Sequence, residues 1–427
     1  MKILIALICL LTINAYCIGQ PFSLPTTKMQ QAIAVKPAAE RMELYLPMLK
    51  GKAVSVFANQ TSMVLGTHLV DTLLSRGIRV TKIFGPEHGF RGVASAGEKI
   101  NNGLDKKSGL PIISLYGSHK KPTSADLKDV DVVLFDIQDV GVRFYTYISS
   151  LEYLLEACIE NNKPLIILDR PNPNGFYVDG PVLDKKYKSF IGMQPIPIVY
   201  GMTMGEYAQM LIGQKWLASP AQSTLININK NADMRLSIYG KNAIPKFNLT
   251  IITCDNYTHA TKYELPVPPS PNLTAMQAIY LYPSTCLFEG TVLSEGRGTA
   301  MPFQIYGHPS LPKHLYSFTP MPNEGAKSSK CYNQLCYGYN LSDTKEATLK
   351  KLGCKINLTY IIDAYQLFPQ KDSFFLTNNF FDKLAGNNAL MAQIKAGKSI
   401  AEIRKTWDKD LAKFKAIRKK YLLYKDF

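Results

Sequence analysis

Two polar runs in the sequence, residues 84–92 and 136–147, hold the side chains best suited to catalysis. In the first run, Glu87 follows Gly85-Pro86, a pair that turns the chain sharply, and precedes His88. A carboxyl group at such a turn can project into a cleft and protonate a leaving oxygen, which is what breaking a glycosidic bond requires. Glu87 and His88 are therefore candidate catalytic residues.

The second run places carboxylate, amide, guanidinium and phenol groups within twelve positions. Asp136 and Asp139 are candidate catalytic partners of Glu87, because a second carboxylate usually assists the acid. The same run supplies four candidate substrate-binding residues, since planar polar groups and aromatic faces suit a sugar: Gln138, Arg143, Tyr145 and Tyr147. Arg143 can bind a substrate carboxylate in bidentate fashion, or it can form a structural ion pair with Asp136 or Asp139.

Regular elements must position these runs, and the apolar pattern predicts where they lie. Apolar bursts without polar alternation occur at residues 53–58, 80–84, 111–115, 130–135 and 165–168, and helical stretches lie near residues 69–76 and 149–161. Such bursts are typical of parallel strands buried on both faces, with helices on each side. The sequence therefore predicts an α/β fold built on a Rossmann-like parallel sheet.

Polar or aromatic residues follow each predicted strand. Besides the two runs, these strand ends supply six candidate substrate-binding residues: Asn59, Gln60, Tyr116, Asp169, Arg170 and Asn172. In open α/β sheets, ligands bind outside the carboxyl ends of the strands, so the five strand ends indicate one site. Polar residues also end strands for purely structural reasons. For Asp169-Arg170 a structural ion pair is the alternative, as it is for Arg143.

Nucleotides are the usual ligands of such a sheet, but their sequence fingerprints are missing. The chain contains no G-x-G-x-x-G and no G-x-x-x-x-G-K-[ST], and it also lacks the hydrolase motifs G-x-S-x-G and H-E-x-x-H. We therefore expect a Rossmann-like frame without a cofactor.

The composition changes near residue 245, where a proline-rich and then a glycine-rich segment begins. We expect a Rossmann-like catalytic lobe over residues 38–244 and a smaller C-terminal α+β lobe over residues 245–427 that contributes loops to the cleft. In this second lobe, Phe288-Glu289-Gly290 and the loop carrying Glu295 and Arg297 are candidates for ligand contact, although solvated turns would have a similar composition.

The closing stretch, residues 394–424, has the pattern of an amphipathic helix. Its apolar stripe, expected to pack in the core, consists of Trp407, Leu411, Phe414, Ile417 and Tyr421.

The first residues have the form of an export signal. Lys2, an apolar run over residues 3–13 and small residues near 15–19 predict a signal peptide over residues 1–19, followed by a linker over residues 20–37. Removing Lys2 lowers the formal charge from +16 to +15. A basic exported protein favours an anionic envelope polymer over nucleic acid as its partner, and we expect no membrane span after leader removal. We expect a periplasmic or secreted protein.

Eight cysteines become six once Cys9 and Cys17 leave with the leader. Cys331 and Cys336 are close enough in sequence to form a local disulfide in an oxidising compartment, and Cys354 can compete for either partner. A zinc site is the alternative, but no second close cysteine pair exists, so disulfide or free thiols are favoured over a metal.

Four motifs together resemble the bacterial exo-β-N-acetylmuramidase family, formerly a domain family of unknown function. They are residues 85–92, residues 136–147, Leu168-Asp169-Arg170-Pro171-Asn172-Pro173 and Glu295-Gly296-Arg297-Gly298-Thr299, and the similarity extends from about Leu49 to residues 418–424. The resemblance implies a Rossmann-like lobe that holds the active site and a smaller C-terminal lobe. It also implies release of N-acetylmuramic acid from non-reducing ends of peptidoglycan fragments, with the glutamate at the position of Glu87 as the leading catalytic candidate.

Our mechanistic hypothesis makes Glu87 the general acid, while its partner is Asp136, Asp139 or the acetamido group of the substrate. The choice of partner decides whether the anomeric configuration is retained or inverted. Muramic acid carries a lactyl carboxylate, which Arg143, Arg170 or Arg297 can recognise. The preference for peptide-bearing or peptide-free sugars stays open.

Two alternatives to this hypothesis come from other classes of protein. One is a two-lobed binding protein that captures cell-wall sugars without turning them over. The other is a metal-dependent hydrolase that uses His88, Asp136 and Asp169 as ligands.

Overall fold

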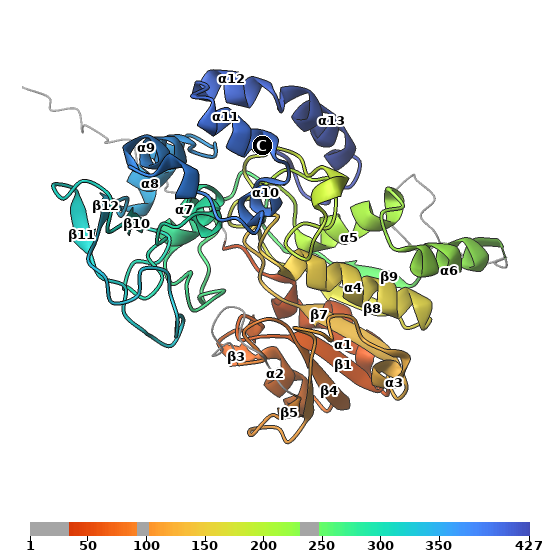
Figure 1. Cartoon of the computed structure of the whole chain (residues 1–427). Coiled ribbons are helices and arrows are strands. Elements are labelled where there is room, and N and C mark those ends of the chain that lie inside the picture. Colours follow the sequence, from red (N-terminus) through yellow and green to blue (C-terminus); the bar gives the residue numbers. More distant parts are fainter. Residues whose placement is uncertain (1–33, 92–101, 231–246) are drawn as a thin grey trace, which may run out of the picture. The chain divides into compact units, whose positions relative to one another are not determined.

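The computed structural model describes residues 34–91, 102–230 and 247–427, and its apolar bursts form a mostly parallel sheet (Figure 1). The described strands follow one another across this seven-stranded sheet in the order β5 (Gly103–Leu104), β6 (Pro111–Ser114), β4 (Val80–Gly85), β1 (Val54–Ala58), β7 (Val132–Asp136), β8 (Leu165–Leu168) and β9 (Leu249–Ile252). Only β5 runs antiparallel to its neighbour. The predicted parallel sheet is confirmed, and all five predicted strands belong to it.

Alternate residues of the strands face two different hydrophobic clusters, one on each side of the sheet. Phe57, Phe135 and Ile167 belong to one cluster, together with apolar side chains of α4 (Tyr147–Glu160), α5 (Met204–Gly213) and α6 (Ser219–Lys230). Val56 and Leu134 belong to the other, together with side chains of α1 (Met42–Leu49) and α2 (Leu69–Ser75). Burial on both faces explains why these strands read as unbroken apolar runs.

Smaller elements complete the described part of the N-terminal half. They are η1 (Ala38–Glu40), the hairpin of β2 (Met63–Val64) and β3 (Thr67–His68), α3 (Ser124–Leu127) and η2 (Lys185–Tyr187). Helix α5 begins with a capping box, in which the Thr203 hydroxyl accepts from the Glu206 backbone N–H and the Glu206 carboxylate accepts from the Thr203 backbone N–H. This reciprocal pair fixes where the helix starts.

The C-terminal half combines a small antiparallel sheet with helices, as the α+β prediction required. The sheet has the order β10 (Ile305–His308), β12 (Cys336–Asn340), β11 (Tyr316–Phe318). The helical elements are α7 (Met276–Thr285), η3 (Cys286–Gly290), α8 (Lys345–Leu352), α9 (Thr359–Leu367), η4 (Lys371–Ser373), α10 (Phe380–Ala385), α11 (Ala389–Lys395), α12 (Ile400–Lys405) and α13 (Asp408–Arg418).

The predicted single helix over residues 394–424 is wrong, because the chain forms α12 and α13 with a break at Trp407. The stripe nevertheless packs as expected: Trp407, Leu411 and Phe414 are buried in the main hydrophobic cluster. This cluster also contains Leu281 of α7 together with Ile167 of β8, so both halves of the chain share one core.

The last residues return to the carboxyl end of β8 in the large sheet. The Tyr424 hydroxyl donates to Asp169 Oδ2 at 2.6 Å, and the Leu423 backbone N–H donates to Glu206 Oε1 at 2.8 Å. Arg418 forms two hydrogen bonds of 2.8 Å with the Asp426 carboxylate. The C-terminus therefore holds the carboxyl end of β8 in place.

Several predictions concern residues beyond those described. The signal peptide at residues 1–19, most of the linker at residues 20–37, Gly92 and the lobe boundary at residues 244–245 lie outside the described residues. Within the described ranges, the structure contains no helix with the length and apolar character needed to cross a bilayer.

Candidate active site

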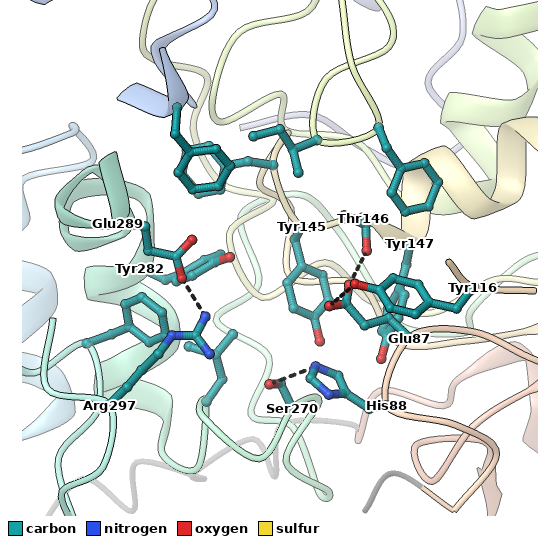
Figure 2. Close-up of a pocket in the computed structure, with 16 residues that line it drawn as sticks. Glu87, His88, Tyr116, Tyr145, Thr146, Tyr147, Ser270, Tyr282, Glu289 and Arg297 are labelled. Carbon is teal, nitrogen blue, oxygen red and sulfur yellow. Dashed lines mark hydrogen bonds and ion pairs between the residues drawn. The ribbon is translucent and has the colours of Figure 1, made fainter. Parts of the chain in front are cut away.

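A pocket of about 380 Å³ opens where the carboxyl ends of β4 and β6 meet the start of α4 and loops of the C-terminal half (Figure 2). Its volume lies at the small end of the range for small-molecule sites, roughly 300–1,000 Å³. The lining residues are Glu87, His88, Tyr116, Phe144, Tyr145, Thr146, Tyr147, Phe190, Ile191, Ser270, Leu273, Tyr282, Glu289, Arg297, Phe303 and Phe380.

Glu87 and His88 reach this pocket from a strained turn. The Gly89 backbone N–H donates to the Pro86 carbonyl at 2.9 Å, which closes the turn directly after β4. His88 has a φ of 68°, a left-handed conformation that non-glycine residues rarely adopt and that costs about 1–3 kcal/mol. Its Nε2 lies 3.3 Å from the Ser270 hydroxyl, across the pocket floor in Figure 2. Strain of this kind clusters at functional sites.

Two hydroxyl groups orient the Glu87 carboxyl. The Tyr116 phenol donates to Oε1 at 2.9 Å, and the Thr146 hydroxyl donates to Oε2 at 2.9 Å. Burial, together with the negative charge of Glu87, raises the pKa of Tyr116, so the phenol keeps its proton. Because Tyr116 follows β6 and Thr146 precedes α4, two separate elements fix this one carboxyl group.

Tyr145 and Tyr147 form an aromatic wall beside Glu87, with their ring centroids 4.8 Å apart. The Tyr145 hydroxyl donates to the Pro269 carbonyl at 2.8 Å, and the Tyr147 hydroxyl accepts from Asn59 Nδ2 at 2.9 Å. Gln60 Nε2 donates to the same proline-rich loop, 3.1 Å from the Pro269 carbonyl. Asn59 and Gln60 do not line the pocket, so the contacts that the structure records for them support its wall.

A charged cluster lies on the other side of the pocket (Figure 2). Arg297 Nη2 donates to Glu289 Oε1 at 2.5 Å, and Arg297 Nε lies 3.2 Å from Glu295 Oε1. Lys330 Nζ lies 2.8 Å from Glu295 Oε2. Burial alone would raise the pKa of Glu295, but the charges of Lys330 and Arg297 outweigh it and lower that pKa. Arg297 and Glu289 line the pocket, whereas Glu295 stands behind them.

The two aspartates nominated as catalytic partners do not line the pocket. Asp136 is fully buried and accepts from Arg170 at 2.5 and 2.9 Å, which is a bidentate ion pair. Asp139 accepts from the Tyr200 hydroxyl and the Gly141 backbone N–H, each at 2.5 Å. Burial raises the pKa of Asp139 to about 6. Both aspartates therefore have structural partners, and the ion pair with Asp136, which was one of the alternatives for Arg143, is made by Arg170.

Four other nominated residues are also committed to contacts inside the protein. The Arg143 guanidinium donates to the carbonyls of Pro181, Ile196 and Leu384, all at 2.8 Å, and is completely buried. Similar internal hydrogen bonds hold the side chains of Gln138, Asp169 and Asn172. These contacts leave the backbone of the strand ends rigid behind the pocket.

Gly141 has a structural role in the second polar run. Its φ is 76°, and a Cβ atom there would collide with the Asn172 side chain. Only glycine fits this combination of a left-handed backbone and a close neighbour. The second and third sequence motifs are thus packed directly against each other.

The pocket also contains residues that were not singled out one by one from the sequence. Thr146 lies within the second polar run, and Glu289 lies within the Phe288-Glu289-Gly290 segment, so both had a sequence signal. Ser270, Phe190 and Phe380 come from loops and a short helix whose composition carries no comparable signal.

The metal-ligand set of the alternative hydrolase is not assembled. Asp136 is paired with Arg170, and Asp169 accepts from the Gly205 backbone N–H and the Tyr424 hydroxyl, while His88 lines the pocket. In the part of the chain that the structure describes, no three His, Cys, Asp or Glu side chains are grouped as metal ligands.

The cysteines of the predicted local disulfide lie together. Cys336 is the first residue of β12 and belongs to a small hydrophobic cluster against which Cys331 packs, whereas Cys354 is exposed. The adjacent Lys330 donates to the carbonyls of Phe288 at 2.6 Å and Thr291 at 3.1 Å. This thiol pair is therefore next to the segment that carries Glu289.

Family models and a curated relative match the chain over nearly all of its described length. The model of the exo-beta-N-acetylmuramidase NamZ N-terminal part matches residues 54–277, and that of its C-terminal part matches residues 280–424. The peptidoglycan beta-N-acetylmuramidase NamZ of Bacillus subtilis (strain 168) is 37% identical over 406 residues, which is 89% of each chain.

Two crystal structures of DUF1343 family proteins from Bacteroides fragilis NCTC 9343 are similar to this structure. The first is 47% identical with a TM-score of 0.80 and covers 92% of this chain and 100% of its own. The second is 26% identical with a TM-score of 0.72 and covers 92% of this chain and 99% of its own. Both sides of the pocket, from Glu87 to Arg297, lie inside the matched family ranges.

Proposed function

Because this chain belongs to the exo-β-N-acetylmuramidase NamZ family, we propose that Glu87 is the general acid with which it releases N-acetylmuramic acid from non-reducing ends of peptidoglycan fragments. The enzyme is a glycoside hydrolase. The observation that carries the assignment is the position of Glu87, a pocket-lining carboxyl held by hydroxyl groups on both oxygens.

The two hydroxyl groups suit a residue that gives up a proton during the reaction. A hydroxyl can both donate and accept, so Thr146 can accept from a protonated Glu87 while Tyr116 donates to the other oxygen. After proton transfer, both hydroxyls donate to the carboxylate. The site can therefore hold both protonation states without moving the carboxyl group, which is the kind of preorganisation that favours catalysis.

The remaining walls suit an amino sugar with apolar substituents. Aromatic rings surround the pocket, and they offer faces for the sugar ring and for the methyl groups of its N-acetyl and lactyl substituents. These rings belong to Phe144, Tyr145, Phe190, Tyr282, Phe303 and Phe380.

Arg297 is the arginine that we assign to the lactyl carboxylate. Of the three arginines nominated from the sequence, Arg297 lines the pocket, whereas Arg143 and Arg170 are buried and bound to partners inside the protein. A guanidinium has five N–H donors, and the contacts to Glu289 and Glu295 use two nitrogen atoms. The remaining N–H groups of the Arg297 guanidinium can donate to the planar lactyl carboxylate.

The test is product analysis with a defined disaccharide in which N-acetylmuramic acid is β-linked to N-acetylglucosamine. Mass spectrometry should detect free N-acetylmuramic acid with the wild-type enzyme. We expect Glu87→Gln to lose about 10²–10⁴-fold in kcat, the usual contribution of a general acid. Glu43→Gln, at an exposed position of α1, is the matched control and should keep full activity.

The same experiment separates the enzyme from its alternatives. A binding protein would leave the disaccharide intact with every variant. A metal-dependent hydrolase would lose activity after exhaustive chelation. We expect chelation to leave the activity of this enzyme unchanged. Full activity of Glu87→Gln would refute the acid assignment even if the product is the expected one.

We also propose that the protein is exported to the periplasm or the medium, where peptidoglycan lies. Lys2 and the apolar run that follows it support this proposal. N-terminal sequencing of the protein from fractionated cells should find a chain that begins after about residue 19. A cytoplasmic protein that retains Met1 would contradict it.

A further inference from the structure

The reaction needs a second group that activates the attacking water or supports the sugar cation, and the pocket restricts the choice. Among the described pocket-lining residues, the carboxyl groups are those of Glu87 and Glu289. Asp136 and Asp139, the partners suggested by the sequence, are buried behind the pocket in contacts with Arg170 and Tyr200. Among the described pocket-lining residues, the candidate for the second group is therefore Glu289, on the wall opposite Glu87.

Glu289 lies in η3 and faces the pocket from the side opposite Glu87 (Figure 2). Its position is tightly fixed, because a Cβ atom at the next residue, Gly290, would lie 2.4 Å from the Phe381 Cα atom. Lys330 further anchors this segment through the Phe288 and Thr291 carbonyls. The carboxylate is therefore presented on a rigid support, as a catalytic group must be.

Arg297 orients the Glu289 carboxylate and compensates its charge. Glu289 Oε1 accepts from Arg297 Nη2 at 2.5 Å, and both side chains are partly exposed to the pocket, at 18% and 19%. The contact that the structure records for Glu289 uses Oε1, which leaves Oε2 for a molecule in the pocket. A carboxylate held in this way can accept a proton from water without first changing its position.

We propose that Glu289 is the general base that activates the attacking water, so that the enzyme inverts the anomeric configuration. This inference rests on the proposed role of Glu87 as the acid. Inverting glycosidases hold the acid and the base on opposite faces of the sugar, far enough apart for a water molecule to lie between the base and the anomeric carbon. Glu87 and Glu289 line opposite sides of the pocket, as this mechanism requires.

In the proposed step, one C–O bond forms, one C–O bond breaks and two protons move. The water oxygen forms a bond to the anomeric carbon as the bond from that carbon to the glycosidic oxygen breaks. The bonding electron pair leaves with the glycosidic oxygen, which takes the proton of Glu87. Glu289 takes a proton from the water. Exchange with solvent returns one proton to Glu87 and removes one from Glu289 before the next turnover.

The first test needs no variant. Proton NMR of wild-type hydrolysis should show the α-anomer of N-acetylmuramic acid as the first product of a β-linked substrate. If the β-anomer forms first, the proposal is overturned, because retention would point to a covalent or acetamido-assisted intermediate.

The second test uses Glu289→Gln and Glu289→Ala, with Glu264→Gln at an exposed site as the control. We expect the Glu289 variants to lose about 10²-fold or more in kcat, both on the disaccharide and on 4-nitrophenyl β-N-acetylmuramide, because water attack is needed for either leaving group. Azide should rescue Glu289→Ala and yield an α-glycosyl azide. Glu264→Gln should match the wild type.

The outcomes also distinguish the proposed base role of Glu289 from the proposed acid role of Glu87. A Glu289→Gln variant with unchanged kcat and raised KM would make Glu289 a substrate-binding residue and overturn its role as base. Loss of the acid role of Glu87 would show instead as full activity of Glu87→Gln on the disaccharide. The anomer of the wild-type product decides the question even if a Glu289 variant does not fold.

Discussion

Single residues in this pocket depend on partners that come from distant parts of the chain. The Glu87 carboxyl is held by Tyr116, which follows β6, and by Thr146, which precedes α4. Each hydroxyl limits the rotation of the Glu87 carboxyl. Each should therefore affect the reaction rate, because it fixes where the transferred proton lies. Tyr116 and Thr146 are therefore positioning residues in this account.

The first prediction concerns Tyr116→Phe. Removing the phenol oxygen deletes one hydrogen bond to Glu87, and a hydrogen bond to a charged group contributes about 1.5–3 kcal/mol. We expect kcat on the disaccharide to fall by roughly 10- to 100-fold, with little change in KM. Tyr316→Phe, at an exposed position of β11, should leave kcat unchanged. Steady-state kinetics would refute the prediction if Tyr116→Phe raised KM alone.

The second prediction concerns the pH dependence of stability at Asp139. Burial raises the pKa of this carboxyl from 3.8 to about 6, so folding favours its protonated form. The resulting stabilisation is complete below about pH 4 and is lost as the pH rises through about 6. This shift in the pKa of Asp139 corresponds to a contribution of about 3 kcal/mol to the free energy of unfolding, at about 1.4 kcal/mol per pKa unit.

Asp139→Asn cannot ionise and should lack this dependence. Urea unfolding between about pH 4 and pH 7 should show that the wild-type protein loses stability relative to the variant as the pH rises. A stability difference that stays constant with pH would show that the carboxyl is already ionised throughout this range.

The sequence analysis named residues that line the pocket together with residues that are buried behind it, and it could not separate the two groups. Glu87, Tyr145 and Arg297 line the pocket, whereas Arg143 and Asp136 are used internally. A charged residue at a strand end looks the same in sequence whether it faces a cleft or a buried partner. The deciding partners, such as the Leu384 carbonyl that binds Arg143, lie far away along the chain.

At the scale of elements, the C-terminal segment stabilises the carboxyl ends of β8 and β9 in the large sheet. Asp169 directly follows β8 and is buried, and burial raises its pKa to about 6. The Tyr424 hydroxyl donates to this carboxyl and also accepts from the Cys254 backbone N–H at 2.9 Å. The Tyr424 hydroxyl is thus the hydrogen-bond partner of both the Asp169 carboxyl and the Cys254 backbone N–H.

The third prediction follows from this contact. Tyr424→Phe leaves the Asp169 carboxyl and the Cys254 N–H without that oxygen, and should cost about 1–3 kcal/mol in the free energy of unfolding. Tyr332→Phe, at an exposed position, should cost nothing measurable. Thermal denaturation of both variants checks the prediction, and equal stability of the two would contradict it.

The fourth prediction concerns the loop between Cys331 and Cys336. Because Cys331 packs against the hydrophobic cluster that contains Cys336, we expect a disulfide between them in the exported protein, formed by thiol–disulfide exchange with a disulfide of the oxidising compartment. Peptide mapping after alkylation should label Cys331 and Cys336 only after reduction. The exposed Cys354 should be labelled without reduction. Labelling of Cys331 without reduction would contradict the prediction.

Buried elements could be predicted from the sequence and exposed or interrupted ones could not. Strands such as β1 and β8 are buried on both faces, so their apolar runs stand out. The two-residue strand β5 is exposed and carries no such signal. The break between α12 and α13 at Trp407 was missed because the apolar stripe continues across it, although Ser399 and Glu402 form a capping box at the start of α12.

At the scale of the whole molecule, the two halves of the chain act as one structure. They share one hydrophobic core, and each supplies one side of the pocket: Glu87 comes from the first half, and Glu289 and Arg297 come from the second. The described residues from Val35 to Phe427 accordingly form one compact unit. Catalysis as proposed needs both halves, because the acid and the base lie on opposite sides of the pocket.

The most direct test of the central claim, that Glu87 is the general acid, is the dependence of Glu87→Ala on the leaving group. The disaccharide needs protonation of its leaving oxygen, whereas 4-nitrophenolate leaves without it. We predict that Glu87→Ala loses about 10²-fold or more in kcat/KM on the disaccharide and far less on 4-nitrophenyl β-N-acetylmuramide. Equal losses on the two substrates would contradict the acid role of Glu87.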